Sequence, residues 1–174
     1  MAGRTGTEIA KRAPETALEV ITSWQNEADR KRLLAEAIAN RDRATIWSAF
    51  TAYMIETRRK AHSSRETLKS YRRALDDLLD WAEAGGAQGH NVDKLRATDA
   101  AVYREHLQEA GGRDGKPLAP ASVNARLAGV RKFMGALVWA GLRDGDPFTG
   151  QGIEDHRPEE KRVPFSGTEV ASLL

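Results

Sequence analysis

Apolar residues recur every three or four positions between Leu68 and Ala82, and this spacing most constrains what the chain can fold into. The stripe consists of Leu68, Tyr71, Leu75, Leu78, Leu79 and Ala82. At about 100° per residue, these side chains occupy one side of a helix. Ser63 and Glu66 have the spacing of a capping box, and Gly85-Gly86 supplies a stop. The sequence therefore predicts an amphipathic helix between these two signals.

The opposite side of this predicted helix is basic, as is the segment before it. Between Arg58 and Arg73 the only acidic residue is Glu66. The basic residues of this stretch are Arg58, Arg59, Lys60, Arg65, Lys69, Arg72 and Arg73. An ordinary solvated helix face mixes the two signs of charge, whereas here the acids of the helix come mainly from Asp76 onward. We therefore favour an anionic partner over a merely solvated face.

Four further stretches have helical spacing, and together they predict an all-α protein. They cover residues 14–39, 42–60, 98–110 and 120–140, with a break expected near Asn26 and a cap expected at Thr98-Asp99. The expected buried residues are Leu18, Ile21, Trp24, Ala28, Leu34, Ala35 and Ile38; Ile46, Phe50, Tyr53, Met54 and Thr57; Val102, Tyr103 and Leu107; and Val123, Leu127, Val130, Phe133, Met134, Leu137 and Val138. No alternating β-branched run is bounded by hairpin turns, which excludes a sheet as the main architecture.

The predicted helix 120–140 has a second face made of small residues. Its small residues are Ala121, Ala125, Ala128 and Gly129, and the polar residues that border them are Asn124, Arg131 and Lys132. Small side chains allow another surface to approach closely. That surface is either a neighbouring helix or the major groove of DNA. The polar border favours the groove, because amide and basic groups suit bases and phosphates.

Composition excludes several other classes of protein. The 174 residues include no cysteine, so disulfides and thiolate metal sites are excluded. No apolar run approaches the roughly 18 residues of a membrane span, and the N-terminus has no apolar signal segment. The four histidines are His62, His90, His106 and His156, and their dispersed positions match no metal-ligand motif. We expect neither a metal nor a cofactor, and no membrane partner.

The composition changes after Gly141, where the chain becomes rich in glycine, proline and acidic residues. This change predicts a linker. A capping box at Ser166 and Glu169 is followed by only five residues, too few for a stable helix, so we expect a piece of a longer protein. The expected domains are a partly helical N-terminal extension (1–40), a helical DNA-binding domain (41–148), a linker (149–163) and the start of a further domain (164–174).

As a series, these stretches resemble the core-binding, SAM-like N-terminal domain of tyrosine recombinases, the phage integrase family. The similar stretches are 45–58, 63–81, 97–107 and 118–142, the triplet Asp146-Pro147-Phe148, and 163–174. The resemblance implies a four-helix core-binding fold, here with an additional N-terminal helical segment and a C-terminal linker. It also implies that the catalytic groups belong to a second domain after Leu174. No catalytic residue is therefore assigned, and the tyrosines Tyr53, Tyr71 and Tyr103 are expected to be core residues.

The function implied is duplex DNA binding at a recombination core site, as the non-catalytic half of a site-specific recombinase. The expected DNA-binding residues are Arg58, Arg59, Lys60, Arg65, Lys69, Arg72, Arg73, Ser122, Asn124, Ala125, Arg126, Arg131 and Lys132. The expected partners are double-stranded DNA and other recombinase protomers, with a monomeric fragment in isolation and a cytoplasmic, nucleoid-associated location. The alternative is a helical protein-interaction module without a DNA function, favoured by the N-terminal apolar stripe and the acidic linker.

Overall fold

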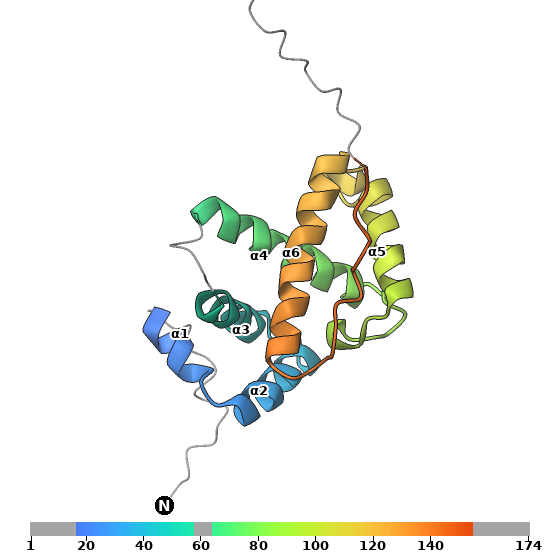
Figure 1. Ribbon diagram of the computed structural model, residues 1–174. Helices are drawn as coiled ribbons and strands as arrows, with labels where there is room; N and C mark the ends of the chain where they lie inside the picture. Colours follow the sequence, from blue (N-terminus) through green and yellow to red (C-terminus); the bar gives the residue numbers. More distant parts are fainter. Residues whose placement is uncertain (1–16, 58–63, 155–174) are drawn as a thin grey trace, which may run out of the picture.

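The computed structural model describes residues 17–57 and 64–154, and every regular element within these ranges is a helix (Figure 1). The α-helices are α1 (Ala17–Ser23), α2 (Glu27–Ala39), α3 (Arg43–Glu56), α4 (Arg65–Glu83), α5 (Ala97–Ala110) and α6 (Pro120–Trp139). Two short 3₁₀ helices, η2 (Val92–Lys94) and η3 (Arg113–Gly115), lie in the connections. The predicted all-α class is confirmed. Within the same ranges, no helix combines the length and the apolar character needed to cross a membrane.

Helix α6 lies at the centre of the core and packs most extensively against α4, which crosses behind it in Figure 1. Its expected apolar stripe is buried except at Val138, with Phe133 and Met134 fully covered. The ring of Phe133 meets Phe50 of α3 edge to face, with 5.5 Å between the ring centroids. The ring of Phe50 also lies near that of Tyr71 on α4, with 6.1 Å between the centroids, so the three helices share one apolar centre.

The crossing of α4 and α6 depends on Gly129. A Cβ atom at this position would lie 2.5 Å from the Cβ of Ala74 and 3.4 Å from the ring of Tyr71. The two helices thus cross too closely to leave room for a side chain at position 129. The small face of α6 therefore has two uses: Gly129 packs against α4, whereas Ala125 and Ala128 are exposed. The expectation that Gly129 is open to solvent for a DNA groove is wrong.

The two N-terminal helices pack on α3 and belong to the same hydrophobic core as the rest. The expected break is confirmed: Asn26 caps α2, because its side-chain oxygen accepts hydrogen bonds from the backbone N–H groups of Ala28 and Asp29. Directly after α1, the buried Trp24 donates its indole N–H to the hydroxyl of Ser48, 3.0 Å away. This contact fastens α1 to the middle of α3.

Three predicted helix ends differ from the structure. The predicted helix 42–60 ends at Glu56, so Thr57 is exposed rather than buried. Helix α4 is capped by Ser64, whose hydroxyl accepts the backbone N–H of Thr67 at 3.1 Å, while Ser63 lies outside the described residues. The third difference is at α5, where the cap lies at Arg96 and not at Thr98. At α4, Ser63 and Ser64 offer the same capping hydroxyl in the sequence, and only the backbone path distinguishes them.

Two valines that were expected to be buried are exposed. Val102 of α5 is 46% exposed and Val138 of α6 is 41% exposed. Both follow the helical spacing but lie at the edge of the buried arc, where no helix among the described residues covers them. The apolar stripe is thus narrower at these two points than the spacing predicts.

Asp99 is a buried carboxylate that holds the start of α5. It accepts hydrogen bonds from the backbone N–H of Arg96 at 2.8 Å and from the guanidinium of Arg96 at 3.3 Å, and His90 lies 3.5 Å away. Burial raises the pKa of Asp99, but these hydrogen bonds and the charges of Arg96 and His90 outweigh it and lower the pKa below its usual value.

Replacing Asp99 with alanine is expected to lower the free energy of unfolding by about 1–3 kcal/mol at pH 7, because the Arg96 N–H loses its buried acceptor. A carboxyl with a lowered pKa stabilises the fold above its unfolded pKa, and this contribution is lost as the pH falls through the folded pKa. The difference between wild type and Asp99→Ala should therefore shrink on acidification. Urea unfolding between pH 7 and pH 3 measures it. Thr98→Ala, the control, should be nearly neutral, and an equal loss at Thr98 would contradict this cap.

Candidate nucleic-acid interface

A basic stripe runs along the exposed side of α4. We use "basic stripe" for Arg65, Lys69 and Arg73, which are four residues apart and therefore lie along one side of the helix. All three are exposed. Within residues 17–57 and 64–154, neither Arg65 nor Arg73 forms an ion pair with a carboxylate. Lys69 contacts Glu66 at 3.1 Å, but their side chains are 73% and 81% exposed. Such a pair contributes little, so all three cations can bind phosphate.

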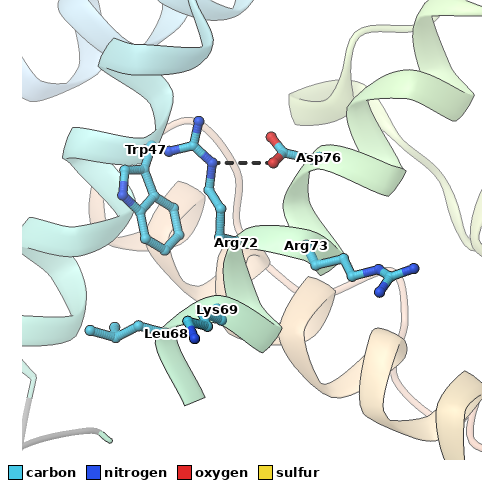
Figure 2. A pocket seen from close by; sticks show the side chains of 6 residues that line it. All are labelled: Trp47, Leu68, Lys69, Arg72, Arg73 and Asp76. Atoms are coloured by element: carbon cyan, nitrogen blue, oxygen red, sulfur yellow. Dashed lines mark hydrogen bonds and ion pairs between the residues drawn. The ribbon is translucent and has the colours of Figure 1, made fainter. Parts of the chain in front are cut away.

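Arg72 belongs to the same predicted basic cluster, but its side chain already contacts other residues of the domain. Its Nε lies 3.2 Å from a carboxylate oxygen of Asp76, and its guanidinium lies over the ring of Trp47, 5.0 Å from the centroid. Figure 2 shows Arg72 beside Trp47 and Asp76, while Arg73 points to the other side. These side chains line a shallow pocket of about 410 Å³ together with Leu68 and Lys69. The charge of Arg72 is therefore partly neutralised before any ligand arrives.

Arg126 on α6 braces the helix crossing. Its Nε lies 2.6 Å from a carboxylate oxygen of Asp77 on α4, and its side chain is only 10% exposed. A guanidinium that is buried and paired in this way links α4 to α6 and is poorly placed to reach a phosphate. Because the two residues are 49 positions apart, no local pattern in the sequence could have paired them.

Asn124 and Arg131, at the edge of the exposed face of α6, are also occupied. Asn124 donates from its amide nitrogen to the carbonyl of Ile153 at 2.8 Å and accepts the N–H of Ile153 at 3.0 Å. The Nε of Arg131 lies 2.9 Å from a carboxylate oxygen of Asp146. Both partners come from the segment after α6, which was expected to be a linker. The pairing of Asn124 with a backbone could not have been recognised from residue types alone.

The remaining predicted site residues fall into three groups. Ser122 and Ala125 are exposed on the N-terminal half of α6. Lys132 is half-buried and lies over the ring of Tyr53, 5.1 Å from its centroid. The group Arg58, Arg59 and Lys60 lies outside the described residues. The structure thus has an open basic stripe on α4 and, on the helix that crosses it, an exposed face of small residues (Ala125 and Ala128) that we call the thin face of α6.

Comparison of the sequence with known protein families identifies the family of this chain. The family model of the phage integrase N-terminal SAM-like domain matches residues 47–141, more than half of the chain. The chain belongs to this family. The matched region of this phage integrase domain starts within α3 and contains all of α4, α5 and α6, whereas α1 and α2 lie before it.

A curated relative supports the same family. The tyrosine recombinase XerC of Chromohalobacter salexigens is 35% identical over 86 residues, which cover 49% of this chain and 26% of that protein. The chain therefore matches about a quarter of that relative's length. No solved structure matches. Membership of the phage integrase SAM-like family supports a recombinase-related role in DNA binding.

Proposed function

We propose that this domain binds duplex DNA at a recombination core site, as the non-catalytic part of a tyrosine site-specific recombinase. The observation that carries the proposal is the basic stripe of α4, whose three exposed cations lack a strong acidic partner within the described residues. A row of exposed cations on one side of a helix is suited to binding the phosphates of a nucleic-acid backbone. The similarity to a tyrosine recombinase supports site-specific recombination as the process to which that DNA binding belongs.

The two helices have different roles in the proposed complex. The basic stripe supplies affinity through phosphate contacts, which carry no sequence information by themselves. The thin face of α6, with Ala125 and Ala128 exposed, allows the helix to approach base edges in the major groove. Arg126 acts behind this surface, because its ion pair with Asp77 fixes the angle between the two helices.

Replacing Arg65, Lys69 and Arg73 together with alanine is expected to weaken binding to all duplex sequences alike. Each phosphate contact contributes roughly 0.9 to the slope of log K against log salt concentration. Loss of the basic stripe should therefore flatten this slope by about 2.7. Fluorescence anisotropy of a labelled duplex at several salt concentrations measures the slope for the variant and the wild type.

The control variant removes the same formal charge elsewhere on the surface. It combines Lys31→Ala, Arg113→Ala and Lys116→Ala, three exposed basic residues outside α4 and α6. The control should keep the wild-type slope. Equal flattening in both variants would mean that only net charge matters. An unchanged slope in the basic-stripe variant would contradict the proposal and favour a protein-interaction module.

A further inference from the structure

The segment after α6 returns along that helix instead of leaving the domain. We use "strap" for residues 146–153, which run back between α6 and α5 in Figure 1. The strap begins in a turn in which a carboxylate oxygen of Asp146 accepts the N–H of Phe148 at 2.8 Å. Phe148 is fully buried and meets the ring of Tyr103 edge to face, with centroids 6.0 Å apart. Near its end, Ile153 packs against the core. The strap is therefore anchored at its start and docked at its end.

The strap binds α6 through two polar side chains on one edge of the helix. Asn124 makes the two hydrogen bonds with the backbone of Ile153, at 2.8 and 3.0 Å. Arg131 makes the ion pair with Asp146, at 2.9 Å. Asn124 and Arg131 are seven residues apart, which is about two helical turns, so they lie on the same side of α6. Both border the thin face that contains Ala128.

The same atoms that hold the strap are those that would bind DNA. An asparagine that reads adenine uses its amide nitrogen as donor and its oxygen as acceptor, the two groups that now bind Ile153. Likewise, the Arg131 guanidinium can pair with a phosphate only when it is not already paired with Asp146. A docked strap and full DNA contact by this edge of α6 therefore exclude each other.

We propose that the strap is an autoinhibitory contact, which occupies Asn124 and Arg131 until it is released from α6 and they become available to duplex DNA. The inference rests on the proposed DNA-binding function and adds a regulatory element to the same site. Because Phe148 keeps the start of the strap in the core, the strap stays close to its binding edge after release. It then competes with DNA as an intramolecular ligand at high effective concentration.

Replacing Asp146 with asparagine tests the Arg131 half of the strap. Asparagine keeps a side-chain oxygen for the N–H of Phe148 but loses the charge that neutralises Arg131. One additional phosphate contact should steepen the slope of log K against log salt concentration by roughly 0.9. When salt is lowered from 200 mM to 50 mM, the affinity of the variant should therefore rise about 3.5-fold more than that of the wild type. Asp144→Asn is the matched control, because Asp144 is exposed and has no partner within the described residues. An equal slope in both variants would overturn the inference.

A pair of substitutions at Ile153 tests the Asn124 half. Ile153→Pro removes the N–H that Asn124 accepts, whereas Ile153→Ala loses similar packing but keeps that N–H. We expect Ile153→Pro to bind a mixed-sequence duplex several-fold more tightly than Ile153→Ala. Adding Asn124→Ala to the proline variant should abolish the gain. Faster hydrogen exchange of residues 149–152 should accompany release of the strap.

The outcomes at Ile153 separate this inference from the proposed function. If wild type binds duplex with a clear salt slope but Ile153→Pro and Ile153→Ala bind equally, the strap does not inhibit and only the inference fails. If wild type shows no salt-dependent binding, the DNA function itself fails, and the autoinhibitory role fails with it. Faster exchange without any change in DNA affinity would also overturn the inference.

Discussion

Replacing Gly129 with leucine is expected to lower the free energy of unfolding by about 3 kcal/mol or more. The first added atom would already lie 2.5 Å from the Cβ of Ala74, and this neighbour is itself attached directly to the α4 backbone. Neither helix can therefore relieve the overlap by rotating a side chain, so α4 and α6 must separate. For a chain of this size, the loss corresponds to a fall in Tm of roughly 6–12 °C, measurable by calorimetry.

The matched control for this variant is Ala125→Leu, one turn earlier on α6. Ala125 is exposed, so the same leucine should change stability by less than about 0.5 kcal/mol. It should nevertheless weaken DNA binding, because a large side chain holds the thin face of α6 away from the base edges. Normal melting of Gly129→Leu would contradict the close helix crossing. Undiminished DNA affinity of Ala125→Leu would contradict the placement of α6 in the groove.

Replacing Asp77 with alanine is expected to destabilise the fold by about 3 kcal/mol. The substitution leaves the guanidinium of Arg126, which is only 10% exposed, without its carboxylate partner. Removal of one partner from a buried ion pair typically costs about 3–5 kcal/mol, and the 31% exposure of the Asp77 side chain favours the lower end of this range. Urea unfolding monitored by circular dichroism gives the free energy of unfolding directly.

The control for the Asp77 prediction replaces both partners with apolar residues. The double variant Arg126→Met with Asp77→Leu should recover most of the lost stability, because no unpaired charge remains buried. It should also keep the salt slope of DNA binding, since Arg126 supplies no phosphate contact in this arrangement. A flatter slope in the double variant would show instead that Arg126 contacts a phosphate.

Much of the fold could be predicted because it depends on local spacing. Two apolar stripes, Leu68 to Ala82 and Val123 to Leu137, correctly predicted a helix and the face that it buries. Asn26 correctly predicted a helix break. These features follow from periodicity and capping, which involve residues a few positions apart. The errors lie at helix ends, as at Ser63 and Ser64, and at the edges of apolar stripes, as at Val102 and Val138.

The candidate site could be predicted only as a region. Arg65, Lys69 and Arg73 form an open stripe, as their charge and spacing suggested, but Arg72 in the same cluster is engaged by Trp47 and Asp76. The local sequence does not distinguish Arg72 from Arg73, because each has an aspartate four residues later. The difference arises from helix α3, which places the ring of Trp47 beside the guanidinium of Arg72.

The sequence by itself determined the all-α class, the two helices of the site and the family resemblance, because these depend on short-range periodicity and on the order of motifs. The tertiary structure alone decided which polar groups remain available. Arg126 is used by Asp77 across 49 positions, and Asn124 is used by Ile153 across 29. A side chain's hydrogen-bonding capacity can be read from its type, but whether a partner already satisfies it depends on chain segments that only folding brings together.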